Sequence, residues 1–195
     1  MSSKNSKVNR IIITGTPGVG KTSVSKKVAS ILNAKYVNLA DFVKSNKLFL
    51  EYDNELNSYI IDEEKTRKIL RRLLKEYSRV VVDTHILTVF DPNAVDLVIV
   101  LRLNPKILLK RLKERNYSLS KIKVNIQAEM LGVCLSEAVE IFGLDKVAEV
   151  DTTARNLEEV VREVLNAIDY PNKYKPGKVD WSQLIYDDEL MKYLV

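Results

Sequence analysis

Hydrophobic residues along this chain gather into short continuous runs, separated by longer segments in which apolar positions recur with helical spacing. Three such runs occupy residues 11–13, 80–82 and 97–101, and residues 147–150 supply a last strand. Continuous apolar runs are typical of strands that are covered on both faces in a parallel sheet. A further strand is expected over residues 34–39. The pattern therefore predicts five strands.

The segments between the predicted strands carry the spacing and the capping residues of helices. The expected helices cover residues 21–32, 41–45, 63–77, 105–115 and 157–168. The positions expected to be buried are Val24, Val28, Ile31 and Leu32 in the first helix, and Ile69, Leu70, Leu73 and Leu74 in the third. Asp62 is a candidate cap, and Asn156 with Glu159 resembles a capping box. Strands that alternate with helices predict a doubly wound α/β domain, with a five-stranded parallel sheet, helices on both faces and a ligand at the carboxyl edge of the strands.

Two segments depart from this alternation. Residues 46–58 are polar, with acidic and aromatic side chains mixed, and we expect them to form a mobile segment that covers a substrate. Beyond residue 169, prolines and a glycine interrupt the periodicity, and the apolar residues around Trp181 are spaced for a short helix. We favour a helix docked on the parent domain, because an exposed apolar stripe is costly. A partner-binding element is the alternative.

Composition limits the classes of protein that fit. The chain has 195 residues, a hydrophobic share of 46% and a net charge of +5, which suit one globular domain. No apolar stretch reaches 18 residues, and the polar N-terminus is followed by no signal-like segment, so we expect a cytoplasmic protein without a membrane partner. Cys134 and His85 are the only residues of their types, which excludes a His/Cys zinc cluster within this chain.

The most specific motif follows the first predicted strand. Residues 15–22 read GTPGVGKT, the phosphate-binding GxxxxGKT pattern, and a predicted helix comes next. In this pattern the backbone at Gly15, Gly18 and Gly20 curls around phosphate oxygens, Lys21 reaches the β- and γ-phosphates, and Thr22 offers its hydroxyl to Mg²⁺. A glycine-rich turn with a chance lysine is the alternative, and the strand and helix on either side argue against it. The sequence therefore predicts a P-loop NTPase that binds a nucleoside triphosphate with Mg²⁺.

The rest of the sequence narrows the nucleotide and the class. Neither Asn46-Lys47 nor Asn172-Lys173 continues into the guanine-reading NKxD element, which favours ATP over GTP. A chain of this length leaves little room for the insertions of large motor ATPases. Small kinases of metabolites and nucleotides become the leading class.

Four blocks of sequence carry a resemblance to a known family. GTPGVGKT, KYVNLADFVK, VVVDTH, and RLKERNY followed by KIKVNIQAE resemble the small adenylate kinases of archaea and eukaryotes, often called isoenzyme six or CINAP. The resemblance implies a nucleoside monophosphate kinase fold, adenylate kinase and ATPase activities, and AMP or dAMP as acceptor. It also implies a role in maturation of the small ribosomal subunit, through a platform ribosomal protein and contact with pre-ribosomal RNA.

The resemblance also assigns residues by position. Gly18, Gly20, Lys21, Thr22 and Ser23 match the ATP loop of the family, Arg115 matches its lid arginine, and Asp83 with His85 matches its Asp-x-His element. It implies a kinase domain over residues 10–169, with a monophosphate-binding segment at 38–61 that includes Asn38, a lid at 114–124, and a tail at 170–195. The lid reads Arg-Asn-Tyr where eukaryotic members have Arg-Gly-Tyr, and residue 84 is Thr where they have Tyr.

Phosphoryl transfer needs positioning and positive charge, and these residues supply both. Lys21 and a Mg²⁺ ion held through Thr22 would neutralise the phosphates, Asp83 would order that ion, and Arg115 would close over them. Arg111 lies one helical turn before Arg115, either beside it over the phosphates or as a solvated surface residue.

Two further residues keep two interpretations each. His85 is a candidate for orienting water in ATP hydrolysis, and a purely structural role is the alternative. Asp41 is either a helix cap or a contact to the substrate. Three functions fit: an adenylate kinase, a nucleotide-switched ribosome-assembly ATPase, and a kinase of a small metabolite.

Overall fold

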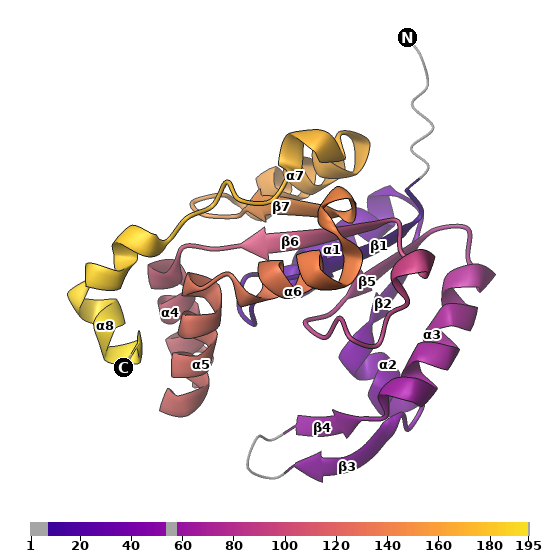
Figure 1. Cartoon of the computed structure of the whole chain (residues 1–195), viewed down its shortest axis with the longest axis horizontal. Coiled ribbons are helices and arrows are strands. Elements are labelled where there is room, and N and C mark those ends of the chain that lie inside the picture. Colours follow the sequence, from indigo (N-terminus) through magenta and orange to yellow (C-terminus); the bar gives the residue numbers. More distant parts are fainter. Residues whose placement is uncertain (1–7, 54–57, 195) are drawn as a thin grey trace.

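Five parallel strands form the central sheet, in the order β2-β5-β1-β6-β7 (Figure 1). The computed structural model describes residues 8–53 and 58–194. The strands are β1 (Arg10–Thr14), β2 (Lys35–Asn38), β5 (Val80–Asp83), β6 (Leu97–Arg102) and β7 (Val147–Asp151). All five predicted strands are therefore present, and the doubly wound parallel sheet is confirmed.

Helices cover both faces of this sheet (Figure 1). Their bounds are α1 (Lys21–Ile31), α2 (Leu39–Ser45), α3 (Glu63–Glu76), α4 (Pro105–Glu114), α5 (Leu119–Met130), α6 (Val133–Phe142), α7 (Leu157–Asp169) and α8 (Asp188–Leu194). Short 3₁₀ turns occur at Pro92–Ala94, Leu144–Lys146, Pro171–Tyr174 and Ser182–Tyr186. One face packs against α1, α4, α5, α7 and α8, and the other against α2, α3 and α6.

Alternation along the strands explains why they are apolar throughout. In β1, Ile11 and Ile13 belong to the core on the α1 side, while Ile12 belongs to the core on the α3 side. Successive side chains of a strand point to opposite faces, so a strand between two helical layers has no polar face. Each helix, in contrast, buries only the side that faces the sheet. In α1, Val24 and Val28 lie one turn apart and are buried. Ile31 was expected on the same face, but it is 53% exposed, since it lies at the solvent side of the last turn.

The segment expected to be a mobile cover contains regular structure instead. β3 (Phe49–Asp53) and β4 (Ser58–Ile61) pair antiparallel in a two-stranded hairpin that projects beyond the main sheet (Figure 1). Phe49 and Tyr59 pack ring against ring, with centroids 4.4 Å apart. These two strands were not predicted from the sequence, the covering role of the segment stays a prediction, and residues 54–57 lie outside the described part of the chain.

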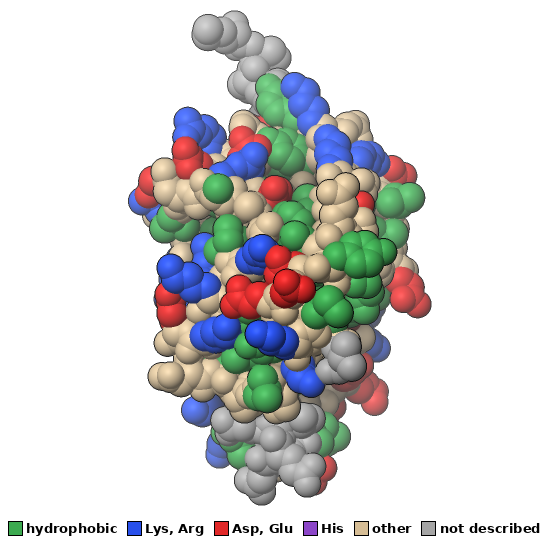
Figure 2. Space-filling view, turned by 90° about the vertical axis from the view of Figure 1, so that its left-hand side faces the viewer, with side chains coloured by type: hydrophobic (Ala, Val, Ile, Leu, Met, Phe, Trp, Pro, Cys, Tyr) green, Lys and Arg blue, Asp and Glu red, His purple; other side chains and the backbone are tan. Residues whose placement is uncertain are grey.

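The tail after α7 returns to the body of the molecule. Helix α8 packs against α5, and Leu190 of α8 is fully buried in the core on that side of the sheet. Figure 2, which views the molecule from the side of α8, shows basic and acidic side chains interspersed with hydrophobic ones on this face. Lys106 pairs with Asp187, and Lys113 pairs with Glu189 at 3.1 Å. The docked helix that we favoured from the sequence is therefore present.

Candidate active site

The phosphate loop, residues 15–22, connects β1 to the start of α1. Gly15 and Gly18 have positive φ angles of 135° and 104°. A side chain at Gly15 would place Cβ 2.4 Å from the carbonyl oxygen of Leu101 in β6, and one at Gly18 would lie 2.7 Å from Leu108 of α4. Gly20 caps α1 in the left-handed conformation. The glycines are therefore required both for backbone conformation and for the close approach of the loop to β6 and α4.

Lys21 folds back over this loop. Its Nζ donates hydrogen bonds to the carbonyl oxygens of Gly15, at 2.7 Å, and Thr16, at 3.3 Å. Burial lowers the pKa of Lys21, and the nearby Arg115 guanidinium acts in the same direction, while the Asp83 carboxylate opposes both. An ammonium group held in such a place is poorly solvated, and phosphate oxygens above the loop would supply the anionic partner it lacks.

A carboxylate with three donors lies at the carboxyl edge of the sheet. Asp83 ends β5, and its Oδ2 accepts hydrogen bonds from the Thr22 hydroxyl at 2.6 Å, the Asn38 amide at 2.9 Å and the Tyr36 hydroxyl at 3.2 Å. The parallel register brings these groups together, because Asp83 pairs with Ile13 of β1 on one side and with Asn38 of β2 on the other. Burial and the Asp83 carboxylate raise the pKa of Tyr36 to about 12, so this phenol remains a donor.

Thr22 and Asp83 form a donor set that suits Mg²⁺. A hydroxyl oxygen and a carboxylate oxygen lie 2.6 Å apart where the loop, β5 and the cavity meet. Mg²⁺ prefers oxygen ligands and is commonly held by one or two side chains together with phosphates and water. Within the described residues, no group of three or more His, Cys, Asp or Glu side chains is arranged to hold a metal. The residues therefore fit a Mg²⁺ ion that arrives with nucleotide better than a permanently bound metal.

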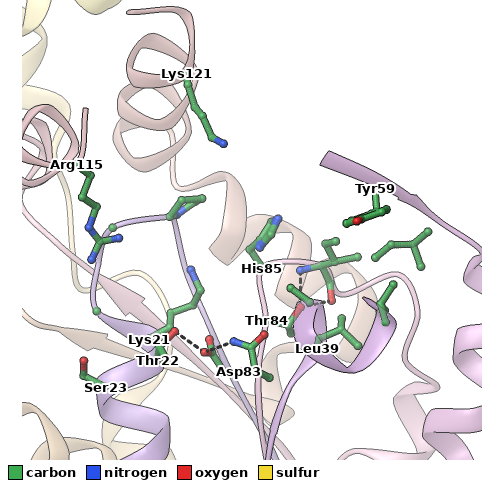
Figure 3. Close-up of a pocket in the computed structure, with 18 of the residues that line it drawn as sticks. Lys21, Thr22, Ser23, Leu39, Tyr59, Asp83, Thr84, His85, Arg115 and Lys121 are labelled. Carbon is green, nitrogen blue, oxygen red and sulfur yellow. Dashed lines mark hydrogen bonds between the residues drawn. The ribbon is translucent and has the colours of Figure 1, made fainter. Parts of the chain in front are cut away.

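These residues line one cavity of about 460 Å³ (Figure 3). Arg115, the residue that ends α4, points toward the phosphate loop from above, and Lys121 of α5 points down toward His85 (Figure 3). Desolvation by the surrounding protein lowers the pKa of His85, and the Lys21 and Lys121 ammonium groups add to that effect. His85 is therefore neutral at pH 7, with a ring nitrogen able to accept a hydrogen bond.

A second hollow, of about 400 Å³, lies on the other side of the phosphate loop. Gly20, Ser23 and Arg115 line both hollows, so the two meet at the loop. Arg111 also lines the second hollow, and its guanidinium donates to the carbonyl oxygens of Gly18 and Val19 at 3.4 and 3.3 Å. Of its two interpretations, the structure supports the placement beside the phosphate loop.

The far end of the first cavity is formed by α2 and the hairpin. Its walls include Leu39, Val43, Ile61 and the ring of Tyr59. Tyr59 also contacts Tyr52 edge to face, at 5.0 Å between centroids. These apolar and aromatic walls stand opposite Arg115 and the phosphate loop (Figure 3). The cavity therefore has one basic end and one apolar end.

Most of the candidate site residues that we predicted from the sequence line this cavity. The lining contains Gly18, Gly20, Lys21, Thr22, Ser23, Asn38, Asp83, His85 and Arg115. Gly15 lies beneath them, with its carbonyl bonded to Lys21. Asp41 does not belong to the lining, and it is not a cap either: Asn38 caps α2 by accepting a hydrogen bond from the Asp41 N–H. The capping interpretation of Asp41 is wrong because α2 begins two residues earlier than expected.

A buried ionic group beside the loop was missed. Arg102, Glu129 and Glu149 are each less than 5% exposed, and Arg102 donates to both carboxylates at 2.8 Å. The other oxygen of Glu129 accepts a hydrogen bond from the Thr16 hydroxyl in the phosphate loop. One signal was available, because Arg102 directly follows the apolar run of β6 at the edge where the ligand is expected. The sequence positions of Glu129 and Glu149 give no indication that these residues contact Arg102.

Comparison with known proteins identifies the family. A profile described as "AAA domain" matches residues 11–132. A protein of Methanocaldococcus jannaschii named "Putative adenylate kinase" is 41% identical over 178 residues, which cover 91% of this chain and 96% of the relative. A protein of the same name from Thermococcus kodakarensis is 44% identical over 184 residues, covering 94% and 98%. The chain belongs to this family of small adenylate kinases. The resemblance drawn from the four sequence blocks is thereby confirmed.

Solved structures show that this chain shares the fold of shikimate kinases. The shikimate kinase of Bacteroides thetaiotaomicron superposes with a TM-score of 0.57 at 18% identity, covering 83% of this chain and 99% of that one. The shikimate kinase of Acinetobacter baumannii in complex with shikimate gives 0.55 at 14%, covering 86% and 96%. At such identities the likeness concerns architecture alone. Within the described residues, no helix is long and apolar enough to cross a lipid bilayer.

Proposed function

We propose that this protein transfers the γ-phosphate of ATP to AMP, giving two molecules of ADP. The observation that carries the proposal is the pair of hollows that meet at the phosphate loop and share Gly20, Ser23 and Arg115. A kinase of two nucleotides needs one site on each side of the transferred phosphate. The second hollow takes the adenosine of ATP, its phosphates lie along the loop, and the first cavity takes the acceptor.

The acceptor end of the first cavity suits a nucleotide. Leu39, Val43 and Ile61 give it aliphatic walls, and Tyr59 adds an aromatic ring on which a flat base can stack. Lys21 and Arg115 bring positive charge to the other end of the cavity, and Lys121 lies above its middle, between Arg115 and Tyr59 (Figure 3). A monophosphate therefore fits with its base toward the hairpin and its phosphate toward the loop.

Catalysis follows from charge and position. The Lys21 ammonium lies where it can neutralise the β- and γ-phosphate oxygens, and Arg115 approaches them from above. Together they hold the two reacting phosphates in line. The acceptor oxygen of AMP is already ionised near neutral pH, because its second pKa is about 6, so the transfer needs no general base.

Thr22 and Asp83 would hold the Mg²⁺ ion that accompanies ATP, which supplies charge neutralisation at the β- and γ-phosphates. Asn38 and Tyr36 orient the Asp83 carboxylate for this role through their hydrogen bonds to Oδ2. Mutual orientation of this kind keeps a ligand set in place before the nucleotide binds.

ATP hydrolysis is the second activity that the sequence resemblance implies. It requires an oriented water molecule, and the neutral imidazole of His85 is our candidate for accepting its hydrogen bond. His85 lines the first cavity, two residues after Asp83. We therefore infer that hydrolysis and transfer use the same phosphate loop and differ in what occupies the acceptor end.

The deciding experiment is a coupled assay of ADP formation from ATP with and without AMP. We expect rapid ADP formation that depends on AMP, and slow ADP formation without it. The Lys21→Ala variant is the control, and it should lose both activities. If AMP leaves the rate unchanged while ATP is slowly hydrolysed, the kinase proposal is wrong and an ATPase remains.

Two other functions make different demands. A kinase of a small anionic metabolite would need basic side chains at the acceptor end, where Leu39, Val43, Tyr59 and Ile61 lie instead. The role in small-subunit maturation, with a platform ribosomal protein and pre-ribosomal RNA, stays a prediction of the sequence resemblance. The cytoplasmic location stays a prediction from the composition of the sequence. Co-purification of a ribosomal protein or a pre-ribosome with the tagged protein tests that role.

A further inference from the structure

The buried ionic group below the phosphate loop joins five separate segments of the chain. Glu129 of α5 is 1% exposed, and its carboxylate accepts four hydrogen bonds. Its Oε1 accepts from Arg102 Nε at 2.8 Å, the Leu103 N–H at 3.1 Å and the Trp181 indole at 3.2 Å. Its Oε2 accepts from the Thr16 hydroxyl at 2.6 Å. The C-terminal segment and the phosphate loop therefore share one carboxylate.

The same segment also holds the second carboxylate. Glu149 of β7 accepts Arg102 on Oε1, and its Oε2 accepts the backbone N–H groups of Gly177 and Lys178 at 2.9 Å and of Val179 at 3.3 Å. Two buried carboxylates face a single guanidinium, so the group carries one excess negative charge. A buried charge is tolerated only when hydrogen-bond donors compensate it. Four of those donors come from residues 177–181.

A short path leads from this group to the nucleotide. Thr16 is fixed by its hydroxyl on Glu129, and its carbonyl oxygen accepts a hydrogen bond from Lys21 Nζ. Arg102 is also held by the backbone carbonyl oxygen of Glu129, to which its guanidinium donates at 2.9 Å. Without the indole of Trp181, the Glu129 carboxylate would lose one of its four hydrogen bonds and with it part of its fixed orientation. Glu129 would then shift, and Thr16 would lose its fixed position in the loop.

We propose that Glu129 is a positioning residue for the phosphate loop, and that the C-terminal segment, residues 171–194, contributes to nucleotide binding through it. The segment acts at a distance from the phosphates, by completing the hydrogen bonds of a carboxylate that orients Thr16. This inference rests on the proposed ATP site at the loop.

Trp181 makes the coupling directly observable, because it is the only tryptophan in the chain. We expect the fluorescence of the full-length protein to change on titration with Mg-ATP, with the same midpoint as the heat of binding measured by calorimetry. In the Thr16→Val variant, which lacks the hydroxyl, the change at saturating Mg-ATP should disappear while binding remains measurable. Unchanged wild-type fluorescence at calorimetric saturation, or a full change in Thr16→Val, would overturn the inference.

A double-mutant cycle separates positioning from general stability. Trp181→Phe removes the indole N–H and keeps an aromatic ring, and we expect it to raise the Kd for Mg-ATP by about three- to tenfold, the effect of one hydrogen bond. In the Thr16→Val background the same change should raise Kd by less than about twofold, because the link is already broken. Its effect on Tm should be equal in both backgrounds.

Glu189→Gln is the matched control, since it removes the ion pair of α8 with Lys113 and lies outside the ionic group. Its Kd should stay within about twofold of wild type. Additive effects of Thr16→Val and Trp181→Phe on Kd would show that Trp181 does not act on nucleotide binding through Thr16, and would overturn the inference. Failure of the wild-type protein to bind Mg-ATP in calorimetry would overturn the proposed function together with this inference, whereas failure of the cycle would leave that function intact.

Discussion

Asn38 serves two elements of the site at once. Its Oδ1 caps α2 by accepting the Asp41 N–H, and its Nδ2 donates to the Asp83 carboxylate. A single residue therefore fixes both the start of α2 and the orientation of the predicted Mg²⁺ ligand. Because the two roles use different atoms of the same amide, they can be separated by substitution.

Asn38→Ser should separate them. Serine caps helices about as well as asparagine, so the free energy of unfolding should change by less than about 0.5 kcal/mol. The shorter side chain cannot donate to Asp83, and we expect AMP-dependent ADP formation to fall about tenfold. Asn156→Ser is the control, because Asn156 caps α7 through the same kind of bond and does not contact Asp83. A variant at residue 38 with wild-type activity would contradict the orienting role.

His85 predicts a pH dependence of ATP hydrolysis measured without AMP. Desolvation holds its pKa below the ordinary value of 6.5, so the imidazole is neutral at pH 7 and gains a proton only as the pH falls further. Protonation removes the acceptor for the attacking water, and the hydrolysis rate should therefore drop on the acid side. His85→Gln should be slower at pH 7 and should lack this decrease. Comparison with the variant cancels the titration of ATP itself, and an unaltered acid limb in the variant would remove His85 from the mechanism.

At the scale of elements, the position of the phosphate loop depends on glycines, which let its backbone lie directly against β6 and α4. Gly15 approaches the backbone of β6, while Gly143 has a positive φ of 80° and open space, to at least 4 Å, around the place that a Cβ would take. Both positions disfavour a side chain through backbone conformation, and of the two only Gly15 adds a steric conflict with main-chain atoms. Substitutions at Gly15 and Gly143 therefore distinguish the cost of backbone strain from the cost of a steric conflict.

Gly143→Ala should lower the free energy of unfolding by about 1–3 kcal/mol, the cost of a side chain at a φ of 80° and a ψ of 154°, a conformation that is essentially restricted to glycine. Gly15→Ala should lower it by about 3 kcal/mol or more, because β1 and β6 must also move apart. Urea unfolding of both variants checks the comparison. Equal losses would mean that the loop tolerates displacement from β6.

The elements that the sequence predicted share a simple property. The strands β1, β5 and β6 are buried on both faces, so their runs of Val, Ile and Leu stand out from the surrounding sequence. The hairpin did not stand out, because Leu50 and Ile60 are 70% and 40% exposed and its strands mix polar with aromatic residues. Its pairing is accompanied by contacts between Phe49, Tyr52 and Tyr59 that only the fold brings together.

The site residues that lie in a contiguous motif or at the end of an apolar strand were predictable from the sequence, whereas contacts between distant segments were not. Lys21 and Thr22 belong to a contiguous motif, and Asp83 ends a recognisable strand. Glu129 and Trp181 are separated by 52 residues, and neither has a neighbour that indicates the other. Contacts of this kind depend on how helices and the C-terminal segment pack, which hydrophobic periodicity does not specify.

On the scale of the whole molecule, the C-terminal segment is part of the core. Leu190 lies in the same cluster as Ile122 and Ile126 of α5 and is fully buried, while the adjacent Met191 is 46% exposed. Helix α5 carries Lys121 into the cavity and Glu129 into the ionic group. Packing of α8 therefore supports the helix on which both functional contacts depend.

Leu190→Ala should lower the free energy of unfolding by about 2–3 kcal/mol, since it leaves a cavity between α8 and α5. Met191→Ala, in the same helix, should cost less than about 0.5 kcal/mol. Chemical denaturation followed by circular dichroism measures both. Equal, small effects would indicate that α8 is only loosely attached to the body.

The buried ionic group of Arg102, Glu129 and Glu149 also constrains the evolution of the sequence. Loss of Arg102 would leave two carboxylates in the interior without a counter-charge, whereas replacement of all three residues by apolar residues of similar size can be neutral. Substitution of Arg102 alone is therefore strongly disfavoured, and we expect descendants to keep this residue or to exchange this trio of residues as a set. Because Trp181 completes the same arrangement, lineages that shorten their C-terminus should be those in which the trio has been replaced.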